Sequence, residues 1–346
     1  ESGIEASAIG ITCANINGGQ IGGRRNVLFN GAMQVVQRGT SFTNVGASAN
    51  TFTLDRWKIY VQNSTARFTV TQDSDSPDEF GGSMKIDCTT TDTSLASTDE
   101  VYLEQRIEGQ DLQHFAKGTS SAKQYTLSFY AKTTKTGTYI VNLLSRDNTT
   151  GSVSAAYTVS DTNWNRYVIP SPADTDSNRK DNNDNGEALR ILWWFVAGSA
   201  VNSGTLNTSW GNSSDTGRAT GQVNFSDSTS NDFYLTGCQL EVGPQASAYE
   251  HRSFAEELAL CKRYYQEYTS ISNRIYTQNV YRVHHPLPVE MRGAPTVTKS
   301  YGTSTNLATD NTSASTKMLK WDIQYTGAGT GIIDIINGTI TLDAEL

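Results

Sequence analysis

Aromatic side chains set among amides and hydroxyls are the residues of this chain best suited to binding a ligand. Trp210 lies in the polar run Asn207–Ser214, which holds no other large apolar residue. In the run Leu189–Val196, strand alternation puts Trp194 beside Arg190, on the face opposite the uncharged positions. An indole ringed by Asn, Ser and Asp is suited to stacking on the apolar face of a sugar. The sequence therefore predicts glycan binding by Trp194, Trp210 and Arg190. The alternative is that neighbouring elements cover both indoles.

Catalytic motifs are missing from the sequence. It contains no GxSxG elbow, no P-loop and no HExxH. The glycine-rich run 327–331 lacks the spacing of a nucleotide fingerprint and does not open a helix. A glycosidase would need two carboxyls held across a cleft, one with a raised pKa. Glu241, between Leu240 and Val242, comes nearest to such a setting, but alternation favours an outward residue or a partner for an arginine. We expect neither enzymatic activity nor a cofactor.

Two short segments contain metal-ligand residue types. The run Asp181–Gly186 begins like a calcium loop, but Leu192 stands at the twelfth position, where such a loop needs a bidentate Glu. Asp174 could add a ligand, so calcium binding by the segment 174–186 stays open, with a solvated turn as the alternative. His284 and its neighbour His285 could meet a metal across a symmetric interface, yet exposed or hydrogen-bonded imidazoles are favoured. No metal site is predicted.

Charge, hydropathy and cysteine spacing exclude several classes of protein. The net charge of −8 disfavours nucleic acid as a ligand, because phosphate binding needs a basic surface. The longest apolar run, Ile191–Ala197, is far shorter than the ~18 residues of a membrane helix, so no membrane insertion is expected. Four dispersed cysteines without a CxxC pair indicate free, buried thiols. They are Cys13, Cys88, Cys238 and Cys261.

The elements that must position these residues are mostly short strands. Residues 26–250 show alternating runs separated by long polar turns, which predicts a jelly-roll β-sandwich. Its long spacers, such as 202–220, are expected at the ends of the sandwich, where loops often carry binding. Residues 1–25 hold few large side chains and are interpreted as a connector and trimerisation segment.

One amphipathic helix is predicted over residues 251–270. Ser253 and Glu256 form a capping box at its start. Phe254, Leu258, Cys261, Tyr265 and Tyr268 follow at helical spacing, which predicts one buried stripe. Residues 271–346 are long enough for a small C-terminal β module, in which Asn337-Gly338 predicts a two-residue hairpin turn. The fold class is therefore mainly β.

Several motifs resemble, in the same order, a known family of jelly-roll domains. The run 26–40 (NVLFNGAMQVVQRGT) and Thr53–Trp57 resemble the opening of such domains in bacteriophage tail-fibre and tail-spike proteins. The resemblance spans residues 26–296, while the middle of that range matches by strand pattern only. Its further motifs are 235–243 (LTGCQLEVG), 249–252 (YEHR), 257–265 (ELALCKRYY) and 287–296 (LPVEMRGAPT).

This resemblance implies a carbohydrate-binding-module-like domain carried on a virion. Secreted modules of this type often hold a structural calcium, but Gln34 and Thr236 depart from its acidic positions. The implied protein is a non-catalytic tail-fibre structural and receptor-binding protein. It would form a homotrimer, contact other phage tail proteins and bind host cell-surface polysaccharide. It would be made in the host cytoplasm and exposed outside the cell on the virion tail. The alternatives are a polysaccharide depolymerase and a virion adaptor or decoration protein that binds only phage proteins.

Overall fold

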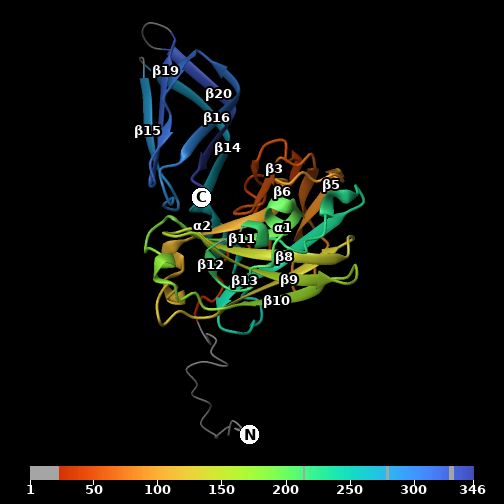
Figure 1. Cartoon of the computed structure of the whole chain (residues 1–346). Helices are drawn as coiled ribbons and strands as arrows, with labels where there is room; N and C mark the ends of the chain where they lie inside the picture. The colour runs from red at the N-terminus through yellow and green to blue at the C-terminus, as the bar shows by residue number, and fades with distance from the viewer. Residues whose placement is uncertain (1–22, 213–214, 278–279, 327–330) are drawn as a thin grey trace, which may run out of the picture.

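Two antiparallel sheets form most of the molecule in a computed structural model of the chain, which describes residues 23–212, 215–277, 280–326 and 331–346 (Figure 1). The predicted connector, apart from residues 23–25, lies outside the described residues. The six-stranded sheet has the order β1 (Ser41–Val45), β4 (Arg67–Asp73), β5 (Ser83–Thr90), β13 (Asp232–Val242), β7 (Tyr125–Thr133), β10 (Asn165–Ser171). The seven-stranded sheet has the order β12 (Gly211–Asn212), β9 (Gly151–Val159), β8 (Gly137–Ser145), β11 (Glu187–Ala197), β6 (Glu100–Glu108), β3 (Lys58–Gln62), β2 (Asn50–Phe52).

The inner faces of the two sheets share one hydrophobic core. Trp57 packs edge-on against Trp193 of β11, with ring centroids 5.4 Å apart, and Phe129 of β7 lies 5.7 Å from the same indole. All three side chains are fully buried, as alternation in β11 requires for its uncharged face. The predicted mainly β class and jelly-roll sandwich are therefore confirmed. Cys88, Cys238 and Cys261 are free and buried, as expected, and Cys13 lies outside the described residues.

The α-helix after the sandwich begins as predicted and ends early. In α2 (Phe254–Lys262), the Ser253 hydroxyl accepts from the Glu256 amide, and the Glu256 carboxylate accepts from the Ser253 amide. The predicted apolar stripe is wrong, because Phe254 is 56% exposed and Tyr265 already belongs to a strand. The side chains of α2 that the fold buries are Glu257 and Cys261.

Seven strands beyond α2 form the predicted C-terminal β module, which stands beside the sandwich in Figure 1. It begins at Tyr265 rather than at residue 271. The Asn337-Gly338 turn is also wrong, since one strand passes through both residues and Asn337 takes a positive φ of 52° within it. One sheet has the order β14 (Tyr265–Thr277), β20 (Gly331–Asp343), β16 (Thr296–Thr305). The other has β15 (Val280–Pro286), β19 (Met318–Tyr325) and β17 (Leu307–Asp310), with β18 (Ser313–Ala314) also on β19.

Short helical turns occur in the long loops of the sandwich. The α-helical turn α1 follows β11 directly and covers part of the seven-stranded sheet. Its bounds and those of the 3-10 turns are α1 (Ser199–Asn202), η1 (Gly109–Asp111), η2 (Gln113–Phe115), η3 (Ser177–Arg179), η4 (Asp215–Gly217) and η5 (Phe225–Asp227). Among the described residues, no helix is long and apolar enough to cross a membrane.

Candidate functional site

The outer face of the seven-stranded sheet carries a row of aromatic rings. Strand register places Tyr60 of β3 opposite Tyr102 of β6, and Tyr102 opposite Trp194 of β11. Tyr60 stacks on Tyr102 with centroids 4.7 Å apart and planes at 17°, and Tyr102 meets Trp194 edge-on at 5.0 Å. Tyr60 is half-buried, and its hydroxyl donates to the Gln62 side chain at 2.5 Å. Part of the Tyr60 side chain therefore remains exposed at the end of this row.

A charged network lies next to the aromatic row. The Glu104 carboxylate, which is 1% exposed, has Lys58 Nζ at 2.5 Å, Arg106 Nη2 at 2.9 Å and Arg190 Nη1 at 3.3 Å. Glu187 takes three further contacts, from Arg190 at 2.8 Å, Arg106 at 3.2 Å and Arg146 at 3.7 Å. Burial lowers the pKa of Lys58, and the attraction of Glu104 opposes that shift only in part. The bases of this network are therefore paired with its two buried or half-buried carboxylates.

The structure places Arg190 on the predicted face and shows that the expected exposure of Trp194 is wrong. Trp194 does lie opposite the core side of β11, yet none of its surface reaches solvent. Val201 of α1 and Ala219 pack with it in a second hydrophobic cluster, and the Arg218 guanidinium lies 5.2 Å above its ring. The polar loop after β11 thus folds back over the sheet. A sugar cannot reach this indole without displacing that loop.

Trp210 lies apart from this face, at the end of the sandwich. It is half-buried against the core, its Nε1 donates to the Pro172 carbonyl at 3.0 Å, and its ring lies 6.4 Å from that of Tyr125. Pro172 also lines a cavity of about 340 Å³ that contains hydroxyls but no charged side chain. A role for Trp210 in glycan binding stays a prediction. The cavity is lined by Leu143, Val153, Ser154, Ala155, Ala156, Ile169, Pro170, Ser171, Pro172, Leu206 and Thr208.

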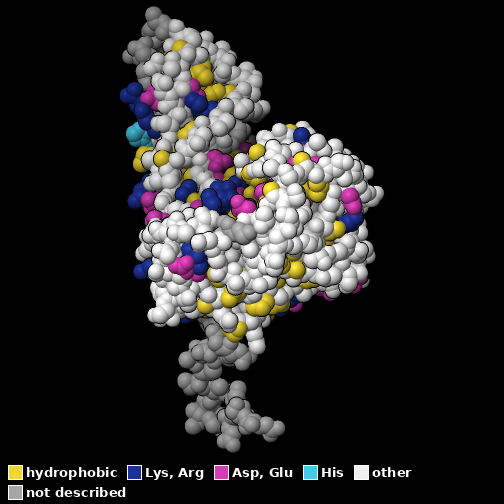
Figure 2. Space-filling model, in the orientation of Figure 1, with side chains coloured by type: hydrophobic (Ala, Val, Ile, Leu, Met, Phe, Trp, Pro, Cys, Tyr) yellow, Lys and Arg dark blue, Asp and Glu magenta, His cyan; other side chains and the backbone are white. Residues whose placement is uncertain are grey.

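The charged network continues into the crevice between the sandwich and the C-terminal module. Figure 2 shows Lys, Arg, Asp and Glu side chains gathered there. A narrow pocket in this crevice includes Phe52, Lys58 and Glu104 together with Leu346. Because Leu346 follows β20, the C-terminal module supplies part of the wall of this pocket.

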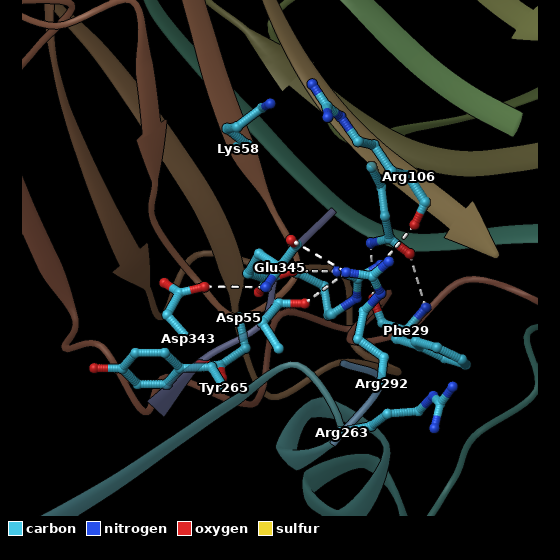
Figure 3. Close-up of polar contacts among 12 residues, drawn as sticks. Phe29, Asp55, Lys58, Arg106, Arg263, Tyr265, Arg292, Asp343 and Glu345 are labelled. Carbon is cyan, nitrogen blue, oxygen red and sulfur yellow. Dashed lines mark hydrogen bonds and ion pairs between the residues drawn. The ribbon is translucent and has the colours of Figure 1, made fainter. Parts of the chain in front are cut away.

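Buried ion pairs fix the module against the sandwich (Figure 3). Arg56 is 2% exposed, pairs with Glu345, and lies 3.4 Å above the Tyr264 ring. Burial would lower the pKa of Arg56, but Glu345 and its other neighbours raise it above the usual value. Arg38 adds contacts to Asp343 at 3.0 Å and to Glu345 at 3.3 Å. The module is therefore held by charge as well as by chain connection.

Glu108 makes a second set of buried ion pairs, next to the pair of Arg56 and Glu345. Its carboxylate is completely buried and accepts from Arg263, with Arg263 Nη2 at 2.7 Å. Arg292 Nε lies 3.8 Å from the same carboxylate, and the Arg292 carbonyl accepts from the Asn185 side chain. These contacts join β6 to the end of α2 and to the loop before β16. These contacts stabilise the fold, because their donors and acceptors are paired with one another.

The segment considered for calcium is built around basic side chains. Asp174 accepts from Arg179 at 2.9 and 3.0 Å, and Asp181 accepts from Lys117 at 2.6 Å. In the part of the chain that the structure describes, no three His, Cys, Asp or Glu side chains are placed to hold a metal ion. His284 and His285 are exposed on β15. Asp174, Asp176 and Asp181 thus bind the protein's own cations, while Asp184 accepts from the Gly186 amide.

Sequence reasoning missed Tyr60 and Tyr102. Each stands in a strand run that alternation identifies, but their stacking depends on the register between β3 and β6, which one sequence does not contain. Trp164, half-buried at the start of β10, was also missed. In the sequence, Trp164 stands between two asparagines, Asn163 and Asn165. An indole among polar residues is also the pattern that predicted a binding role for Trp210.

Comparison with known proteins finds likeness only among solved structures. No protein-family model matches the chain, and no curated protein matches it. A structure described as CBM4 is 14% identical, with 62% of this chain and 97% of that chain covered and a TM-score of 0.32. The family 11 carbohydrate-binding module of the cellulosomal cellulase Lic26A-Cel5E of Clostridium thermocellum is 13% identical, with 61% of this chain and 98% of that chain covered and a TM-score of 0.29. The CBM22-1 xylan-binding domain of Paenibacillus barcinonensis Xyn10C is 12% identical, with 59% of this chain and 95% of that chain covered and a TM-score of 0.29. Likeness at this level does not extend to individual residues.

Proposed function

We propose that this chain is a bacteriophage tail-fibre protein that binds host-surface polysaccharide without catalysis. The ordered motifs over residues 26–296 support the tail-fibre assignment. The observation that carries the binding assignment is the half-buried ring of Tyr60, stacked on Tyr102 and bordered by the charged network at Arg190.

Binding at this strip follows from the physical chemistry of sugars. A pyranose has an apolar ring face and a rim of hydroxyls, so an aromatic platform with polar neighbours satisfies both. Tyr60 supplies the platform, and Tyr102 behind it keeps the ring in one orientation, which lowers the entropy lost on binding. Gln62 supplies an amide group for hydroxyls, and Arg190, paired with Glu187 and Glu104, borders the ring.

Binding of purified bacterial capsular and lipopolysaccharide glycans to the full chain tests the proposal. Tyr60→Ala removes the platform and should weaken binding about tenfold or more while the chain stays folded. Tyr325→Ala, a change to another half-buried tyrosine but in the C-terminal module, is the matched control and should bind normally. Normal binding by Tyr60→Ala would contradict the assignment of this strip.

A depolymerase is the second candidate, and its products distinguish it. Such an enzyme releases new reducing ends from polysaccharide, whereas a non-catalytic receptor-binding protein leaves their number constant. We expect no release after prolonged incubation with any glycan that binds. Binding to other tail proteins, together with failure to bind every glycan, would instead favour the adaptor role.

The proposed assembly is a homotrimer located on the virion tail. Its support is the resemblance of residues 26–296 to tail-fibre and tail-spike domains, which are usually trimers. Light scattering at micromolar concentration should give three times the chain mass of 37.7 kDa. A mass of one chain would contradict the trimer and leave the glycan proposal to be judged by its own test.

A further inference from the structure

The outer face of the six-stranded sheet carries a second group of aromatic and charged side chains. Strand register aligns Lys85 of β5, Tyr234 of β13 and Lys132 of β7 in one row across three neighbouring strands. All three side chains are half-buried. Trp164, which directly precedes β10, approaches this row with its ring centroid 6.1 Å from that of Tyr234 and the planes at 69°. Two aromatic rings thus meet at the surface with polar groups around them.

The Trp164 indole is fixed in orientation by a hydrogen-bonded chain. Its Nε1 donates to Asp75 Oδ1 at 2.8 Å, and the other oxygen of Asp75 accepts from Lys132. Asp75 is in turn held by its backbone, since its amide donates to Asp73 Oδ1 at 2.8 Å and its carbonyl accepts from the Ser83 hydroxyl at 2.6 Å. A ring held in this way loses little freedom when a ligand stacks on it.

Trp164 differs from the other tryptophans of the chain in its surroundings. The side chains of four are buried in hydrophobic clusters, and Trp210 packs against the sandwich core. Trp164 instead contacts Tyr234 and Asp75. Burial in the core therefore does not account for an indole at this position. The four buried tryptophans are Trp57, Trp193, Trp194 and Trp321.

The charges around the two rings indicate which ligand fits. Lys132 pairs with Asp75, and Lys85 pairs with Asp232 at 3.1 Å, so the two ammonium groups are neutralised. Asp87 lies opposite Asp232, and burial together with Asp232 raises its pKa. An anionic ligand would meet these carboxylates unfavourably. Paired carboxylate and ammonium groups offer acceptors and donors to adjacent hydroxyls, which a neutral sugar presents.

We propose that Trp164 and Tyr234 form a binding site for neutral hexose units, separate from the strip at Tyr60. The sugar stacks its apolar face on the Trp164 ring. Asp75 and the lysines beside Tyr234 bind its hydroxyls. The chain then carries one sugar site on each outer face of the sandwich, and a branched or repeating glycan that reaches both gains from their combined valency.

Chemical footprinting of the native chain tests this site directly. N-bromosuccinimide oxidises accessible indoles, and peptide mass spectrometry reports the oxidation of Trp164 and Trp210 separately. The probes are the methyl glycosides of glucose, galactose and mannose, together with N-acetylglucosamine. At least one should slow the oxidation of Trp164 at millimolar concentration while the rate at Trp210 stays constant. No protection of Trp164 by any of the four would overturn the proposal.

Variants separate this site from the proposed function. Trp164→Ala should weaken binding of the protective sugar about tenfold, whereas Trp164→Phe should keep most of it, because an aromatic platform remains. Equal binding by Trp164→Ala and the wild type would overturn the site; if that variant does not fold, the footprint decides. Tyr60→Ala should leave the protection of Trp164 unchanged. Loss of polysaccharide binding in Tyr60→Ala alone would therefore support the strip at Tyr60 without bearing on Trp164.

Discussion

The two outer faces of the sandwich carry similar residue types and expose them differently. On the seven-stranded sheet, Trp194 and Glu104 are 0% and 1% exposed, because α1 and the following loop cover the first and three basic side chains surround the second. On the six-stranded sheet, Trp164 is half-buried, and the Asp75 side chain is 40% exposed. Strand alternation thus decides which face a side chain joins, while segments elsewhere in the chain decide whether that face meets solvent.

The largest expected difference between the faces is in the cost of removing an indole. Trp194→Ala should lower the free energy of unfolding by ~3–5 kcal/mol, because it leaves a cavity under α1. Trp164→Ala, at a half-exposed position, should cost less than about 1 kcal/mol. Urea unfolding of both variants measures the two values. Similar losses would mean that exposure does not distinguish the two faces.

A smaller difference between the two faces is expected in the free energy of unfolding when a carboxylate is replaced by an amide. Glu104→Gln leaves Lys58 buried beside a neutral amide and should cost ~1–3 kcal/mol. Asp75→Asn breaks a half-exposed pair with Lys132 and should cost ~0–1 kcal/mol, as surface ion pairs do. Both changes keep the side-chain shape, so urea unfolding compares charge alone. A cost at Asp75 equal to that at Glu104 would contradict the comparison.

The smallest expected effect is a response to acid on the six-stranded face. Hydrogen bonds from Lys132 and from Trp164 lower the pKa of Asp75 below its usual value. A carboxyl with a lowered folded-state pKa stabilises the fold above its unfolded-state pKa, and that stabilisation is lost as pH falls through the folded-state value. The emission of Trp164 should therefore change below about pH 4 and stay constant from about pH 5 to 8.

Two variants isolate that response. Subtracting the emission of Trp164→Phe from that of the wild type gives the contribution of the indole at 164. Asp75→Asn removes the titrating group and should abolish the acid response. A response that persists in Asp75→Asn would assign it to another carboxyl.

Patterns within one stretch of sequence predicted the local structure well. Alternation in 189–196 placed Trp193 in the core and Trp194 on the opposite face, and the Ser253–Glu256 capping box marked the start of α2. The end of α2 was misjudged because Tyr265 pairs with Asp343 of β20, and this distant strand overrides the helical spacing.

Exposure and charge pairing could not be predicted, because they depend on contacts between distant segments. The cover over Trp194 comes from Val201 and Ala219, which stand in a polar loop without any periodic pattern. Arg56 directly precedes the core residue Trp57, yet its ion-pair partner is Glu345, 289 residues away. The sequence analysis predicted Arg190 as a site residue. It did not predict Tyr60, because the stacking of Tyr60 on Tyr102 depends on strand register.

The ties of Arg38 and Arg56 to the residues after β20 have a mechanical consequence. The chain leaves the sandwich through α2 into β14, and it returns to the sandwich surface at Asp343 and Glu345. A body joined at one point rotates about that point, whereas a body fastened at two points resists torsion. A pull applied to either face of the sandwich would therefore be transmitted to the C-terminal module as a load shared by both fastenings, with little twist between the two bodies.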